Sequence, residues 1–210
     1  MAQMRVNPNR MELMKLRSRR QVAQRGHKLL KDKLDELMKA FLARIGESRT
    51  LRAEVERQLF AAYGTVAVAR GAAGRAALAG ALASGNPEPI VSVEERNVMS
   101  VRIPEFTLEK LPEPGGYSFV TTPVAFDTAL AALAAVAPRL VELAEKEKAI
   151  ELLAAEIERT RRRVNALEHV LIPQLDETIR GIGMKLDEAE RSNLTRLMKV
   201  MEIIEAQDQR

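Results

Sequence analysis

The sequence predicts an all-α dominated fold, a long antiparallel two-helix coiled coil of N- and C-terminal helices with a small β-hairpin insert at its distal end. Three observations support this prediction. Two long segments carry apolar residues at helical spacing, a short Pro-rich segment separates them, and aromatic residues make up only 3% of the chain. Because large compact cores usually bury more aromatic surface, this composition favours long helices with much of their surface in water.

The first long helix is expected within residues 1–83. Asn7-Pro8-Asn9 is a start signal, because Asn caps helices and Pro suits a first turn. An apolar stripe then steps by three and four, and its most regular part comprises Leu30, Leu34, Leu37 and Phe41. The pattern predicts a helix from about Asn9 to Leu82.

Residues 61–85 near the end of this helix are rich in Ala and Gly. Each Gly weakens a helix by about 1 kcal/mol relative to Ala, so the stretch fits a fraying end. The alternative is a closely packed helix face, where small side chains let another backbone approach. The sequence leaves both open.

A Pro-rich insert is expected over residues 84–123, which hold six of the nine prolines. Val91 and Val93, and then Met99, Val101 and Ile103, alternate with polar residues, which is typical of strands. A second short run, Tyr117–Thr121, follows two glycines. The insert therefore predicts a small β-hairpin.

The second long helix is expected within residues 124–210, so that the three segments form a single elongated domain. Its most regular part is a coiled-coil seam with steps of three and four, formed by Ile150, Leu153, Ile157, Thr160, Val164, Leu167 and Leu171. The steps from Leu167 to Leu171 and to Leu175 are both four, which predicts a stutter beside Pro173. The stripe continues through Leu194, Leu197, Met201 and Ile204.

Two long helices joined by a compact insert are expected to pack antiparallel. If the chain ends meet, facing residue numbers sum to about 210–220, and both termini lie at one tip. This register places His27 near residue 188 and His169 near residue 46. Residues 1–33 hold ten Lys and Arg against two acids, which indicates an anionic partner surface or pairing with acids near the C-terminus.

Few features point to catalysis. The chain has no Cys and no phosphate-binding loop motif, and its two histidines are expected to lie far apart. We therefore expect no cofactor, no metal site and no catalytic residue. The start of the chain is polar and no run of 18 apolar residues is present, so the sequence predicts no signal peptide and no membrane insertion.

Four blocks of sequence resemble the D subunit of V-type (A/V-type) ATPases. Asn7–Leu13 (NPNRMEL) and Arg25–Lys33 (RGHKLLKDK) are similar to the family's N-P-T-R-M-x-L start and its G-x-x-L-L-K-x-K block, with Asn9 in place of the usual Thr at a capping position. Thr160–Glu168 (TRRRVNALE), followed by Ile172-Pro173, is similar to T-x-R-R-V-N-A-L-E-x-x-x-I-P. Glu95–Val101 (ERNVMSV) is similar to the E-x-N-I-M-S-V strand. The resemblance covers nearly the whole chain.

This resemblance implies a central-stalk rotor shaft without a catalytic site of its own. The shaft would mechanically couple ATP hydrolysis or synthesis in a ring of catalytic A and B subunits to H⁺ or Na⁺ translocation through a membrane ring. The implied partners are the A and B subunits, the central-stalk F subunit and the C/d-type subunit that caps the membrane ring. The implied location is cytoplasmic, peripheral to the membrane through the complex.

The resemblance and the charge distribution together suggest two partner-binding sets. The set for the A/B ring comprises Arg10, Lys15, Arg17, Arg19, Arg20, Arg196 and Lys199. The set for the F subunit and the lower stalk comprises Val93, Val98, Val101, Arg161, Arg162 and Arg163.

Two alternatives remain open from the residues alone. One is a structural coiled-coil scaffold outside any ATPase. The other is a basic coiled-coil protein that binds nucleic acid, because phosphate neutralisation needs only clustered Lys and Arg. No aromatic residue lies among Arg161, Arg162 and Arg163, and acids flank them, which argues against nucleic acid.

Overall fold

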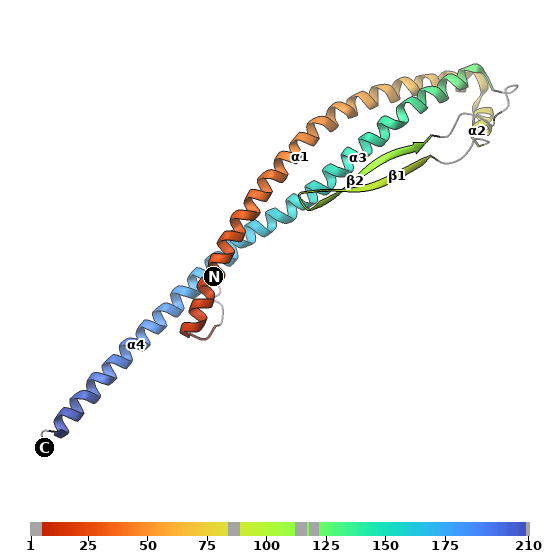
Figure 1. The fold of residues 1–210 in the computed structure, drawn as a ribbon. Helices are drawn as coiled ribbons and strands as arrows, with labels where there is room; N and C mark the ends of the chain where they lie inside the picture. Colours follow the sequence, from red (N-terminus) through yellow and green to blue (C-terminus); the bar gives the residue numbers. More distant parts are fainter. Residues whose placement is uncertain (1–5, 84–88, 112–116, 118–121, 209–210) are drawn as a thin grey trace. The chain divides into compact units, whose positions relative to one another are not determined.

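The computed structural model describes the chain apart from residues 1–5, 84–88, 112–116, 118–121 and 209–210. In chain order it has α1 (Arg10–Ala73), α2 (Arg75–Ala83), β1 (Ile90–Val98), β2 (Val101–Lys110), α3 (Val124–Ala166), the π-turn η1 (Leu167–Leu171) and α4 (Ile172–Asp208) (Figure 1). The predicted fold class is confirmed, with long N- and C-terminal helices and a small antiparallel hairpin between them.

The chain divides into two compact units. The terminal unit comprises Met1–Asp35 and Glu158–Arg210, and the hairpin unit comprises Glu36–Ile157. Each unit buries apolar clusters of its own. Each is therefore described separately.

The terminal unit buries one apolar stripe of α1 against α4. Leu16 and Ala23 pack with Leu175 and Ile182, and half-buried leucines and isoleucines surround them. Two ion pairs flank this cluster, Arg10 with Glu190 and Arg20 with Asp176, whose Nε–Oδ1 distance is 2.6 Å. The two helices run antiparallel, because residues late in α4 face residues early in α1.

The helix register differs from the expected one. Arg10 faces Glu190, and His27 faces Glu168 rather than residue 188, so facing numbers sum to about 200 or less. The apolar contacts set this register, since Leu16 and Ala23 are covered only where Leu175 and Ile182 lie opposite. Part of α4 consequently continues past the start of α1, so the described helix ends, Arg10 and Asp208, do not meet at one tip as expected (Figure 1).

The predicted stutter beside Pro173 is a π-turn. The amide of Ile172 donates to the carbonyl of Leu167, five residues earlier. Two successive steps of four need more residues per turn than the 3.6 of an α-helix, and the wide turn supplies them. It also opens the helix just before Pro173, whose ring would otherwise crowd the preceding turn.

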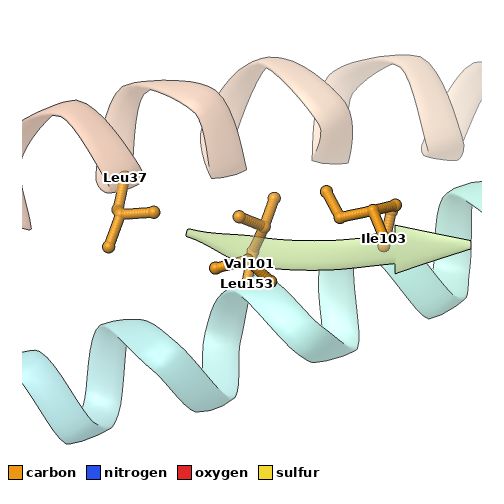
Figure 2. Packing of buried hydrophobic residues seen from close by; sticks show 5 residues of the cluster. Leu37, Val101, Ile103 and Leu153 are labelled. Carbon is orange, nitrogen blue, oxygen red and sulfur yellow. The ribbon is translucent and has the colours of Figure 1, made fainter. Parts of the chain in front are cut away.

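The hairpin unit places β2 along the pair formed by α1 and α3. Val101 and Ile103 of β2 pack into one buried cluster with Leu37 of α1 and Leu153 of α3 (Figure 2). This contact gives the two-stranded hairpin the apolar support that an isolated hairpin lacks in water. Its turn is Met99–Ser100, both with positive φ, as a two-residue type I′ turn requires.

The first helix is shorter than expected. α1 ends at Ala73, and α2 begins after Gly74, whose φ of +79° no helix interior allows. The alanines of this stretch are the residues that pack closely, because Ala69 and Ala81 are buried with Phe126 and Ala129 of α3. The close-packing interpretation of residues 61–85 thus holds for alanines, whereas the described glycines have open space around their α-carbons.

The second run expected in the insert, Tyr117–Thr121, falls outside the described residues except for Tyr117. The Tyr117 ring packs edge-on against Phe126, and its hydroxyl donates to Asp127 Oδ1 at 2.5 Å. This hydrogen bond raises the pKa of the Tyr117 hydroxyl above its usual value, because it stabilises the protonated phenol. The contact lies at the start of α3.

One helical run, Val124–Glu205, is long and apolar enough to cross a membrane by length and composition alone. The run contains no 18 consecutive apolar residues, so it does not contradict the expectation of no membrane insertion. A helix that packs in a protein core passes the same test. Several apolar residues of α3, including Phe126, Ala129 and Val136, are buried against α1 or α2.

The hydroxyl of Thr160 yields a first prediction. Thr160 is 1% exposed, and its Oγ1 has no hydrogen-bond partner among the residues that the structure describes. An unpaired buried hydroxyl costs free energy, so Thr160→Val should raise the free energy of unfolding by about 1 kcal/mol in a denaturant titration.

Thr178 is the matched control. It is also buried, but its Oγ1 donates to the Gln174 carbonyl at 2.7 Å. Thr178→Val removes a made hydrogen bond and should not stabilise the protein. A loss of stability in Thr160→Val would show that this hydroxyl has a partner in solution.

Gly74 yields a second prediction. Gly74→Ala should lower the free energy of unfolding by about 1–2 kcal/mol, because an L-residue is strained at positive φ. Gly64→Ala, in the α1 interior with equally open surroundings, should instead raise it by up to about 1 kcal/mol. Thermal unfolding of both variants checks the contrast, and equal effects would contradict it.

Candidate partner-binding surfaces

The basic residues near the start of α1 differ in how they are paired. Arg10 pairs with Glu190, Lys15 with Glu12 at 2.8 Å, and Arg20 with Asp176. Arg17 and Arg19 are exposed and have no ion pair among the described residues. The charges at Arg17 and Arg19 are therefore the ones most available to an anionic partner.

A groove of about 890 Å³ lies beside these basic residues within the terminal unit. Leu16, Val22, Leu167 and Leu171 supply its apolar walls, and polar residues such as Lys15 and Arg19 also line it. The groove runs between one face of α1 and the π-turn. It combines an apolar floor with positive charge.

Arg196 and Lys199 do not join the α1 residues in one surface. Arg10, the first residue of α1, lies opposite Glu190. Arg196 and Lys199 therefore lie farther along α4, beyond the part that α1 faces. Lys199 pairs with Glu202 at 2.7 Å, and Arg196 is exposed with no ion pair in the described chain. The single set expected from the sequence thus separates into two places on the terminal unit.

The end of α4 is an exposed surface with many apolar side chains. Every residue from Asp187 to Glu205 is exposed. The large apolar side chains among them are Leu194, Leu197, Met198, Val200, Met201, Ile203 and Ile204. The sequence predicted that the stripe of Leu194, Leu197, Met201 and Ile204 continues, but not that α1 leaves it uncovered.

The set expected for the lower stalk divides between the units. Arg161, Arg162 and Arg163 are exposed in the terminal unit, and Arg162 pairs with Glu158 at 2.5 Å. In the hairpin unit Val93 is exposed, and Val98 is partly buried against the cluster that contains Val101. Val101 faces the core, so its side chain supports the hairpin instead of lining a surface.

The expected seam lies inside the helix pairs. Leu37, Leu153 and Val164 are buried, whereas the remaining seam residues are half-buried, namely Leu30, Leu34, Phe41, Ile150, Ile157, Leu167 and Leu171. These residues hold helices together and leave the outer faces to partners.

His27 meets the π-turn rather than the end of α4. Its Nε2 lies 3.2 Å from Glu168 Oε2, and the His27 side chain is largely buried. Among the described residues, no group of three or more His, Asp or Glu side chains is placed to hold a metal ion. This polar pair adds to the apolar contact of Leu167 and Leu171 with α1.

Comparison with known proteins identifies the relatives of this chain. The family model for the D subunit of ATP synthase matches residues 12–202. The V-type ATP synthase D subunit of Acetivibrio thermocellus is 50% identical over 208 residues, which cover 97% of this chain and 94% of the relative. Its counterpart in Thermoanaerobacter sp. (strain X514) is 47% identical, with 97% and 99% covered. The counterpart in Clostridium botulinum is 47% identical, with 95% of each covered.

The family match spans nearly all of α1, the hairpin, α3 and most of α4, and the relatives are similar over almost their full lengths. The sequence motifs and the fold of two long helices around a hairpin agree with it. The chain belongs to the family of ATP synthase D subunits.

Proposed function

We propose that this chain is the central-stalk rotor subunit of a V/A-type rotary ATPase. It would transmit torque between a ring of catalytic A and B subunits and an ion-translocating membrane ring, and it would have no catalytic site itself. Membership of the D-subunit family supports this assignment. The ion moved, H⁺ or Na⁺, depends on the membrane ring.

The exposed end of α4 is the observation that carries the proposal. Leu194, Leu197, Met201 and Ile204 step by three, four and three, so they share one helix face. Contiguous apolar patches on protein surfaces mark interaction sites, because their exposure to water is costly. We infer that this face lies inside the A/B ring, which would cover it.

The charges on the terminal unit give this contact a second component. Arg17, Arg19 and Arg196 are exposed without ion pairs in the described chain, and we assign them to acidic surfaces of the A/B ring. Arg10, Lys15, Arg20 and Lys199 already have acidic partners. Their contribution to ring binding should be smaller, since an existing pair must be broken or shared.

The remaining assignments concern the lower stalk. We assign Arg161 and Arg163, with the exposed Val93, to the F subunit and its surroundings, and Val98 and Val101 to the support of the hairpin. A C/d-type subunit would join this shaft to the membrane ring. The chain would then be cytoplasmic and peripheral to the membrane, held there by the complex.

Co-purification tests the assignment as a whole. An affinity-tagged copy of the chain, produced in its source cells, should retain the A, B and F subunits through gel filtration. Mass spectrometry identifies the retained proteins. If the tagged chain elutes without any of them, the rotor assignment is wrong and the scaffold alternative gains support.

The apolar face of α4 yields a sharper prediction. The double variant Leu197→Asp and Met201→Asp should reduce ATP-driven rotation of the reconstituted complex at least about tenfold, because two charges would enter an apolar contact. Both side chains are exposed, so unfolding of the isolated chain should change little.

Ser192→Asp is the matched control for this variant. Helical spacing places Ser192 on the face opposite Leu197 and Met201, and it is also exposed. Rotation in this control should remain close to that of the unchanged protein. Equal losses in both variants would show that the apolar face has no special role.

The arginines of α3 yield a further prediction. Arg161→Glu with Arg163→Glu should weaken binding of the F subunit by about tenfold, because like charges would replace attractive ones. The control exchanges Arg162 and Glu158, which keeps their ion pair and the net charge. Surface plasmon resonance with the purified F subunit measures both, and unchanged affinity in the double variant would refute the assignment.

A further inference from the structure

The two faces of the hairpin are both apolar in part. Val101 and Ile103 belong to the face that packs on α1 and α3. Side chains alternate along a strand, so Phe106 and Leu108 belong to the other face, opposite Val93 and Val91 in the register. Val91 is 41% exposed and Val93 is 59% exposed.

The turn fixes which backbone groups of β1 face outward. A two-residue turn joins Val98 and Val101, so this closing pair exchanges hydrogen bonds, and bonded and non-bonded pairs alternate from there. Pro104, opposite Glu95, falls on a non-bonded pair, where its missing N–H costs the ladder nothing. The same alternation turns the amides of Val91, Val93, Glu95 and Asn97 away from β2.

The two outer edges of the hairpin differ in how their backbone groups are hydrogen-bonded. On β2, Pro104 has no donor, and the amide of Phe106 donates to Glu145 Oε2 of α3 at 3.0 Å. On β1, no backbone group of the outer edge has a partner among the described residues. Figure 1 shows β2 on the side of α3 and β1 on the far side.

An open nine-residue edge strand with apolar side chains is unusual in a soluble assembly, because it can pair with another chain. The charged residues of β1 follow its apolar part. Arg96 pairs with Glu105 and Glu95 with Arg102, whereas Glu94 has no ion pair in the described chain. The edge thus offers backbone donors and acceptors, two valines and one free carboxylate.

We propose that the outer edge of β1 binds an extended segment of another subunit of the complex, which adds a third strand to the hairpin. This inference rests on the proposed function, because the partner is a subunit of the same assembly. The added strand bonds to the outward groups of Val91 and Val93. Its alternate apolar side chains extend the face of Phe106 and Leu108, and a Lys or Arg on it pairs with Glu94.

Hydrogen exchange tests the proposal, because the alternation gives it a distinct pattern. In the isolated chain the amides of Val91 and Val93 should exchange quickly, and those of Ser92 and Glu94 slowly, since they bond to β2. In the complex purified from source cells, the amides of Val91 and Val93 should exchange at least about tenfold more slowly than in the isolated chain. Successive amides from Val91 to Glu94 would then all be protected.

Three results would overturn it. If the complex is purified and the amides of Val91 and Val93 still exchange quickly, the edge of β1 has no partner. Strand addition is then wrong, although the proposed function remains supported. If no complex with ATP synthase subunits can be purified, the proposed function fails and this inference fails with it. If the isolated chain gains the protection as its own concentration rises, the occupant is a second copy.

A substitution separates backbone pairing from side-chain contact. Val93→Pro removes one outward amide while leaving the ladder to β2 intact, as Pro104 does on the other strand. It should weaken assembly by roughly fivefold to tenfold. Val93→Thr keeps the amide and should have a smaller effect, with slow exchange at Ser92 confirming an intact hairpin. Equal affinity of Val93→Pro and the unchanged chain would contradict strand addition.

Discussion

The burial of a single apolar stripe of α1 is the constraint on which the rest of the structure depends. In the terminal unit the stripe packs on Leu175 and Ile182, and in the hairpin unit on Leu153 and Val136. Aliphatic side chains fill most of these contacts, so few aromatic residues are needed. Each helix keeps most of its circumference free, which suits a protein that works by contact with others.

The sequence predicted what depends on local periodicity. The two long helices, the strand segments at Val91–Val93 and Val101–Ile103 and the stutter near Pro173 follow from the spacing of apolar residues or from Pro. Met99, which the same alternation placed in a strand, lies in the turn instead. The register between the helices could not be predicted in this way. Apolar residues such as Leu16, Ala23, Leu175 and Ile182 recur so regularly that sliding one helix along the other by a turn or two still pairs apolar residues. The break at Gly74 was equally hidden, since Ala and Gly are frequent on both sides of it and only backbone conformation distinguishes that glycine.

The candidate surfaces were predicted less well than the fold. Charge clustering identified the basic residues of α1, but it could not distinguish Arg20, which pairs with Asp176, from Arg17 and Arg19. Those pairings depend on the register. The exposure of the apolar face of α4 also depends on the register, because the register decides which part of α4 lies beyond the start of α1. Contacts between distant segments therefore decide which residues of a long helical chain remain available.

The π-turn at Leu167–Leu171 has a further consequence for how the chain tolerates change in length. It holds one residue more than a regular turn, so a one-residue deletion there would restore an α-helix instead of breaking it. Residues downstream would keep nearly the same sides of the helix, because the wide turn already absorbs the extra residue. Related chains with and without this residue would therefore present the same side of α4 to α1, although their sequences differ in length at this turn.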